Sequence, residues 1–239
     1  MTTERVSATA SDADCPIPAR AGLIGFVGTW LCASVASSLP LVAFVDPDDT
    51  VPIPVLAASL LAGWITFLVG VTLTSRTNGS GDVASDLGIT ARPIDLVGIP
   101  IGIVAQVAVV PLVYVPLRAA WPATFDDEAL TDTAKDLVDR ADGILLPLLF
   151  VLVAFGAPIV EEIVYRGLLQ RPLLRRYPTP AVIVGVAAVF ALIHFRPVEY
   201  PGLFVAGLVF GVCAWRTGRV GLAVAAHVGF NLAGLALAL

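Results

Sequence analysis

Residues 144–170 read ILLPLLFVLVAFGAPIVEEIVYRGLLQ, and this stretch decides how the chain folds. Residues 144–160 are uncharged and nearly as long as the roughly 20 apolar residues of a membrane-spanning helix. Three charged residues follow within six positions: Glu161, Glu162 and Arg166. A charged group at membrane depth costs at least about 2.5–3.5 kcal/mol, so such groups face a protein interior or a water-filled cavity. The stretch therefore predicts a spanning helix that carries a polar site.

The composition of the whole chain fits a membrane protein. The chain is 57% hydrophobic and 14% charged, with a mean hydropathy of +0.89, whereas soluble domains carry about 25% charged residues. Within a bilayer the backbone must pair internally, as helices or a closed barrel. The apolar runs are long and do not alternate, which favours helices. We expect an all-α, polytopic bundle in contact with the lipid bilayer. A net charge of −5 and a single lysine exclude the basic footprint of a nucleic-acid partner.

About seven transmembrane helices are predicted from the apolar runs. They cover residues 22–44, 53–75, 94–117, 144–170, 180–196, 201–216 and 220–238. Residues 1–20 are polar and are expected to form a disordered cytoplasmic N-terminus, so that residues 21–239 make up one bundle. The longest connection, about 118–143, is acidic and is expected to be a loop.

Basic residues indicate the orientation of the bundle. With the N-terminus in the cytoplasm, ten of them fall inside: Arg5, Arg20, Arg76, Arg92, Arg166, Arg171, Arg175, Arg176, Arg216 and Arg219. Four fall outside: Arg118, Lys135, Arg140 and Arg196. Cytoplasmic loops carry the excess of Lys and Arg. We therefore predict a multi-pass protein of the cell membrane with its N-terminus in the cytoplasm and its C-terminus outside.

Six polar residues in three of these helices are expected to form one site: Glu161, Glu162, Arg166, His194, His227 and Asn231. Glu162 and Arg166 are four residues apart, as are His227 and Asn231, so each pair shares one helix face. Counted from the predicted cytoplasmic helix ends, Glu161 and His194 both lie roughly 21 Å deep. The common depth predicts a single site if the three helices are neighbours.

Peptide hydrolysis is one chemistry that these residue types support. It needs a base for the attacking water and hydrogen-bond donors for the oxyanion. Glu161 is the candidate base with His194 beside it, and His227 and Asn231 are candidate donors. Metal catalysis is the alternative: Glu161, His194 and His227 could hold a divalent metal such as zinc and leave one position for water. An HExxH motif is absent from the sequence, so zinc is not required.

Three motifs resemble those of the CAAX protease and bacteriocin-processing (Abi, CPBP) family of intramembrane peptidases. They are Glu-Glu-x-x-Tyr-Arg-Gly at 161–167, Phe-x-x-x-His at 190–194 and His-x-x-x-Asn at 227–231. Asp-Leu-Gly-Ile at 86–89 is similar to a segment that often precedes the third helix of the family, and the motif core covers about 140–239.

The resemblance implies a role for each motif residue. Glu161 would activate the water together with His194, and Glu162 and Arg166 would support them. His227 and Asn231 would stabilise the oxyanion. Eukaryotic members cleave the last three residues from prenylated CAAX proteins, and the family is often described as metalloproteases, although a metal-independent glutamate mechanism is also favoured.

The predicted function is thus a CAAX-prenyl-protease-like intramembrane (metallo)endopeptidase. It would hydrolyse a peptide bond of a membrane-associated protein or peptide. One alternative is a non-catalytic immunity or scaffold protein of the same fold. A small-solute or proton transporter is a third reading, because buried Glu and His side chains can relay protons.

Overall fold

The computed structural model describes residues 15–46, 48–125 and 127–239. This part of the chain is helical and contains no strand, which confirms the all-α prediction. Within it, six helical segments are long and apolar enough to cross a membrane: α1 (Ala19–Phe44), α2 (Ile53–Asn78), Pro93–Ala120, Leu145–Leu174, Pro197–Thr217 and α12 (Gly221–Ala238). The chain is therefore built as a multi-pass membrane protein.

Three of these segments join several helical elements end to end. Pro93–Ala120 consists of η2 (Pro93–Val97), α4 (Gly98–Val104), η3 (Ala105–Val109) and α5 (Val110–Ala120). Leu145–Leu174 consists of α7 (Leu145–Phe150), η4 (Val151–Gly156), α8 (Ala157–Glu162), η5 (Ile163–Gln170) and α9 (Arg171–Leu174). Pro197–Thr217 consists of η6 (Pro197–Glu199) and α11 (Tyr200–Thr217). The segments η3, η4 and η5 are π-helical, a geometry that occurs frequently at functional sites.

A seventh apolar helix, α10 (Thr179–Leu192), is shorter than the predicted helix 180–196. The prediction was wrong for the last four residues, so His194 lies in the turn after the helix. The backbone tightens there, because His194 N–H donates to the carbonyl of Ala191 and Phe195 takes a φ of 53°. Arg196 precedes a proline, a position that disfavours helical geometry.

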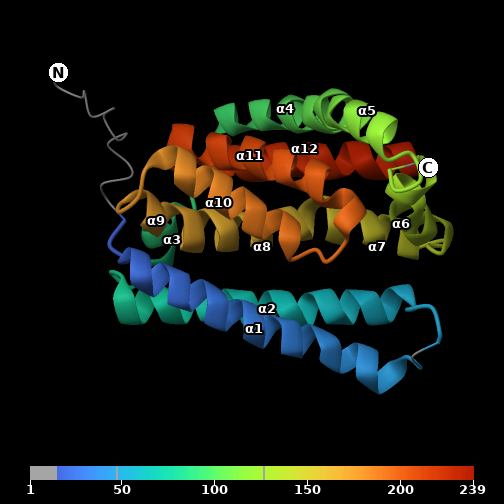
Figure 1. The fold of residues 1–239 in the computed structure, drawn as a ribbon. Coiled ribbons are helices and arrows are strands. Elements are labelled where there is room, and N and C mark those ends of the chain that lie inside the picture. Colours follow the sequence, from blue (N-terminus) through green and yellow to red (C-terminus); the bar gives the residue numbers. More distant parts are fainter. Residues whose placement is uncertain (1–14, 47, 126) are drawn as a thin grey trace.

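The helices form layers, and small residues allow them to approach closely. Figure 1 shows α1 and α2 together on one side of the central α8–α10 layer, with α11, α12, α4 and α5 on the other side. A Cβ atom on Gly70 of α2 would overlap the side chain of Thr29 in α1. Similarly, a Cβ atom on Gly102 of α4 would overlap the backbone of Ala226 in α12. Such contacts stabilise helix pairs where lipid provides no hydrophobic driving force.

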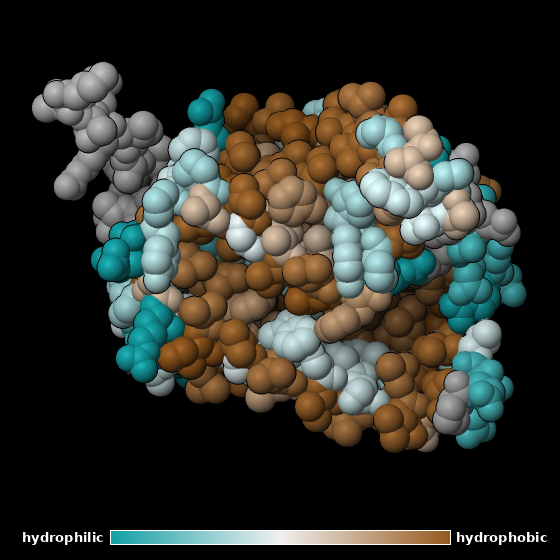
Figure 2. Space-filling model, in the orientation of Figure 1, coloured by the Kyte–Doolittle hydropathy of each residue, from teal (hydrophilic) through white to brown (hydrophobic). Residues whose placement is uncertain are grey.

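The two ends of the bundle are polar and the middle is apolar. Figure 2 shows hydrophilic residues gathered at both ends and hydrophobic residues over most of the surface between them. Figure 1 places the start of α1 and the C-terminal end of the chain at opposite ends of the bundle. This agrees with an odd number of crossings, and the side of the membrane on which each end lies stays a prediction.

Two predicted irregular segments contain ordered structure. The predicted loop 118–143 includes a helix, α6 (Asp127–Asp139). Of the N-terminus predicted to be disordered, residues 1–14 lie outside the described residues. Cys15 and Ile17 are buried, and α1 begins at Ala19.

A buried carboxylate fixes the connection between α2 and α3 (Val83–Leu87). Asp86 is fully buried and accepts hydrogen bonds from the hydroxyls of Ser75 and Ser80, each at 2.5 Å, and from the Ser80 and Gly81 backbone N–H groups. Burial raises the pKa of the Asp86 carboxyl, but these hydrogen bonds outweigh that effect and leave the pKa below its ordinary value of 3.8. The Asp-Leu-Gly-Ile segment at 86–89 therefore has a structural role at this end of the bundle.

Candidate functional site

A buried group of three charged or titratable side chains lies at the centre of the bundle. The Nε atom of Arg166 is 2.9 Å from Oε2 of Glu162, and Nδ1 of His227 is 3.0 Å from Oε1 of the same carboxylate. Glu162, Arg166 and His227 are at most 4% exposed. Oε1 lies within hydrogen-bond distance of His227, and the charge of the carboxylate is paired with that of Arg166. Among the described residues, Oε2 itself makes no hydrogen bond.

Phe190 packs at the centre of the same cluster and brings the two histidines together. It is 1% exposed, and its ring centroid is 5.0 Å from that of His194 and 5.8 Å from that of His227. The guanidinium carbon of Arg166 lies 5.4 Å from the centroid of the Phe190 ring, close enough for a cation–π contact. These contacts place the helices of all three motifs side by side, as the single-site prediction required.

Hydrogen bonds to α11 hold η5 in position. Arg166 donates to the carbonyl of Gly207 at 3.3 Å, and Gln170, four residues later, donates to the carbonyl of Gly211 at 2.9 Å. The donors and the acceptors are both four residues apart, so two helix faces meet in register. Gln170 was not among the predicted site residues, and its spacing from Arg166 was the signal that could have found it.

Glu161 and His194 line one pocket, of about 200 Å³, together with residues of α1 and α2 such as Trp30 and Trp64. Both side chains are partly exposed, unlike the Glu162 group. Nδ1 of His194 lies 2.6 Å from the carbonyl oxygen of Phe190. A carbonyl only accepts, so Nδ1 carries the proton, and Nε2 of the neutral ring is an acceptor.

Asn231 lies on the same helix as His227 but contacts a different wall. Its amide donates to the carbonyl of Val153 at 2.8 Å, within the π-helical η4, and its side chain lines a second pocket of about 410 Å³. The structure therefore divides the six predicted residues among the Glu161–His194 pocket, the buried Glu162 group and the Val153–Asn231 contact.

The candidate metal ligands do not come together as a set. Within the part of the chain that the structure describes, no group of three or more His, Cys, Asp and Glu side chains could hold a metal ion. Glu161 and His194 share a pocket, whereas His227 is bonded through Nδ1 to Glu162. The donor set thus falls short of the three protein ligands of a catalytic zinc site.

Phe210 is a further residue of the cluster that sequence reasoning missed. Its ring stacks on that of His227, with centroids 4.4 Å apart and an interplanar angle of 19°. Phe210 and Phe190 therefore hold the His227 ring from two sides. Nothing in the spacing of Phe210 distinguishes it from the other apolar residues of its helix.

Comparison with known proteins supports the resemblance found in the motifs. Residues 143–233 match the family model of the type II CAAX prenyl endopeptidase Rce1-like proteins. The match contains all six predicted site residues and agrees with the family that the motifs resemble. The comparisons with curated proteins and with solved structures each found no match. Residues 143–233 thus have an intramembrane CAAX-protease-like fold.

Proposed function

We propose that the protein is an intramembrane endopeptidase that hydrolyses a peptide bond of a membrane-associated protein or peptide. The observation that carries the proposal is the shared pocket of Glu161 and His194 together with the proton position on His194. A pocket of about 200 Å³ has room for water molecules, each of which occupies roughly 30 Å³ of liquid volume.

In the proposed reaction, Glu161 and His194 hold the attacking water. The carboxylate of Glu161 and Nε2 of neutral His194 are both acceptors, so each can take one hydrogen of the water. Glu161 removes a proton as the water oxygen bonds to the scissile carbonyl carbon. The same proton then passes to the leaving nitrogen as the C–N bond breaks. General base catalysis of this kind contributes typically about 10²–10⁴-fold.

The buried group of Glu162, Arg166 and His227 supports the proposed reaction by positioning other side chains. Glu162 and Arg166 fix the helix turn that carries Glu161, and Glu162 orients the ring of His227. Asn231 uses one N–H on Val153, and its amide nitrogen carries a second N–H for an oxyanion. Since Nδ1 of His227 donates to the Glu162 carboxylate, Nε2 donates as well only in the imidazolium form.

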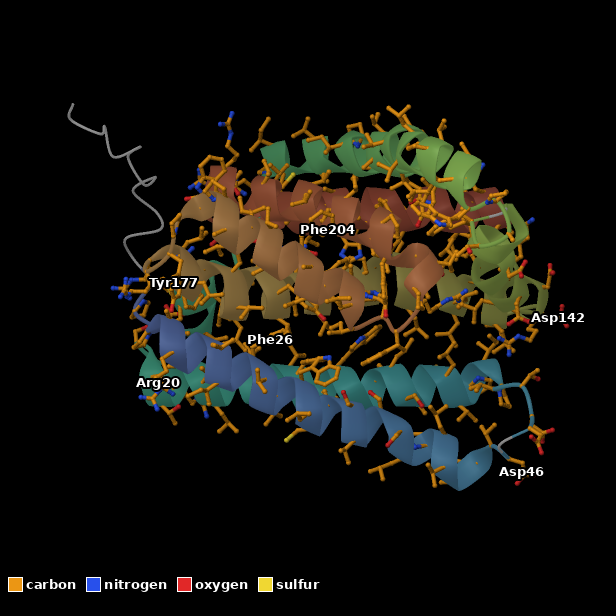
Figure 3. All side chains as sticks on the ribbon, in the orientation of Figure 1. Arg20, Phe26, Asp46, Asp142, Tyr177 and Phe204 are labelled. Carbon is orange, nitrogen blue, oxygen red and sulfur yellow. The ribbon has the colours of Figure 1, made fainter. Side chains whose placement is uncertain are left out.

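The proposed orientation places the arginine-rich end of the bundle in the cytoplasm. Arg20 lies in the first turn of α1 and Arg76 lies in the last turn of α2, so both belong to that end. Figure 3 shows Arg20 and Tyr177 at this end, and Asp46 and Asp142 at the opposite one. The excess of basic residues on the cytoplasmic side supports this assignment. Tagging each terminus and testing its accessibility in sealed vesicles would determine the orientation.

The substrate class is tested with defined peptides. The protein in proteoliposomes is given a farnesylated carboxyl-terminal CAAX peptide and the same peptide without the lipid, and released carboxyl-terminal fragments are measured. Glu161→Gln should abolish cleavage while preserving the fold, and Asp46→Asn, an exposed change outside the site, should retain it. In cells, the carboxyl termini of membrane proteins in wild-type and Glu161→Gln strains would identify other substrates.

The experiment also separates the proposal from a non-catalytic scaffold of the same fold. If Glu161→Gln and His194→Asn both fold and both preserve the cellular phenotype, the scaffold reading replaces the enzyme. Cleavage that persists in Glu161→Gln would overturn the assigned base.

A further inference from the structure

A large groove separates α1 from α10 at the arginine-rich end of the bundle. It encloses about 980 Å³ and is distinct from the pocket of Glu161 and His194. Residues of α1 such as Phe26 line one side, and residues of α10 such as Gly185 and Val189 line the other. Leu173 of α9 also lines the groove. Apart from its mouth, the groove is apolar, so its occupant within a bilayer is a hydrocarbon chain.

The mouth of the groove carries positive charge. Arg20 is the second residue of α1, and Arg176 follows α9, so both lie at the polar end of the groove. Figure 3 shows Arg20 and Tyr177 at this end, with Phe26 further along α1 between α1 and the central layer. Among the described residues that line the groove none is acidic. The groove therefore combines an apolar channel with two guanidinium groups at head-group level.

Arg20 and Arg176 belong to the arginines whose charge is not paired with a carboxylate among the described residues. Arg140, Arg166, Arg196 and Arg219 each form an ion pair with a carboxylate. Within the described residues Arg20 and Arg176 form no such pair, and both are exposed. Guanidinium groups bind phosphate oxygens through two parallel hydrogen bonds. Their charge at the mouth is thus complementary to a phosphate.

We propose that the groove between α1 and α10 is a binding site for an anionic phospholipid. The phosphate binds between Arg20 and Arg176, and one acyl chain lies along the apolar groove past Phe26 and Gly185. Basic pockets between transmembrane helices are known to bind acidic lipid head groups. The site does not depend on the proposed peptidase activity, because it rests on different side chains and is measured by lipid binding.

Lipid binding to the purified full-length protein tests the proposal. Native mass spectrometry compares phosphatidylglycerol with phosphatidylcholine of identical acyl chains. We expect the wild-type protein to retain phosphatidylglycerol selectively. Each arginine near an anionic membrane surface strengthens binding about fivefold, so the double variant Arg20→Gln/Arg176→Gln should bind the lipid roughly 25-fold more weakly. The matched control Arg76→Gln/Arg216→Gln removes the same charge from the same end but outside the groove, and should bind normally.

A second pair of variants tests the acyl-chain part of the site. A Cβ atom on Gly185 meets no described heavy atom within 4 Å, so Gly185→Leu fills the groove without a clash. It should weaken binding on the order of tenfold by displacing about two methylene groups of the lipid. Gly28→Leu makes the same change on α1 at a position that is equally open and does not line the groove, and should have no effect.

Three outcomes would overturn the site. Equal retention of phosphatidylcholine would show that the head-group charge is not recognised. Equal loss in the Arg76→Gln/Arg216→Gln control would show a general attraction to the basic end. Unchanged binding in Gly185→Leu would show that the lipid lies elsewhere. Peptide cleavage measured on the same preparations is a separate readout, so a failure of the proposed function leaves this test intact.

Discussion

Nδ1 of His227 lies 3.0 Å from Oε1 of Glu162, although 65 positions separate the two residues in the chain. This contact joins α12 to the segment Leu145–Leu174 inside the bundle. Arg166 completes the group on the other carboxylate oxygen. The contact points Nδ1 of His227 at the carboxylate and so fixes the orientation of the ring.

Removal of one partner from the buried pair is expected to destabilise the protein. Arg166→Met leaves the carboxylate of Glu162 without its cation, which costs about 3–5 kcal/mol at a buried site. The double variant Glu162→Met/Arg166→Met removes both charges and should recover most of that loss. Thermal unfolding in detergent measures the stability of both variants. If Arg166→Met unfolds at the wild-type temperature, the pair contributes no stability.

His194 is expected to affect activity and leave stability nearly unchanged. His194→Asn removes the Nε2 acceptor and should lower kcat by about 10²–10⁴-fold. The side chain is only partly buried, so unfolding should shift little. Arg196→Gln, in the same turn, is the control, because its partly exposed ion pair with Glu199 is worth about 0–1 kcal/mol. Comparable losses in both variants would assign the effect to the turn and not to His194.

The side chain of His227 is expected to contribute to catalysis as a hydrogen-bond donor. His227→Leu removes the donor and the 3.0 Å contact with Glu162, and should lower kcat by about 10²–10³-fold. His227→Gln keeps an amide N–H and should lose less. The measurement is kcat of both variants in proteoliposomes. Equal losses in the two variants would contradict a role as donor.

The Asp86 carboxylate predicts a stability change that depends on pH. Asp86→Asn replaces an acceptor-only group that binds four donors, and should cost about 1–3 kcal/mol near neutral pH. The pKa of Asp86 is lowered in the folded protein, so the stability it provides is present above its ordinary pKa of 3.8 and is lost as pH falls through the folded value. The free energies of unfolding of the wild-type protein and Asp86→Asn should therefore converge in acid. A difference in the free energy of unfolding that stays constant with pH would contradict an ionised Asp86 in the folded protein.

Chelation is expected to leave peptide cleavage intact. Among the described residues that line this pocket, Glu161 and His194 are the candidate metal ligands, whereas a catalytic zinc site uses three protein ligands. Activity of the reconstituted protein is measured after exhaustive treatment with a chelator and again after zinc is added back. Loss of activity that zinc restores would contradict the metal-independent base and return His227 or another donor to the ligand set.

Much of this fold was predictable because a bilayer leaves few options. Long apolar runs without alternation can only be helices there, and the six spanning segments lie where hydropathy placed them. The end of α10 was not predictable by the same rule. An apolar run continues through Phe195, while the turn at His194 depends on local hydrogen bonds and on the proline at 197.

The candidate site could likewise be predicted from the sequence only in part. Four-residue spacing in the sequence determined that Glu162 can pair with Arg166, because both lie on one face of one helix. The sequence also placed all six polar residues within or next to apolar runs, and ionisable groups at membrane depth mark a site because they are costly there. Only the tertiary structure decided that His227 contacts Glu162, that the ring of Phe190 packs against both histidines, and that Asn231 contacts Val153. Those contacts depend on the rotation and depth of helices from distant parts of the chain, and a periodic pattern within one helix specifies neither.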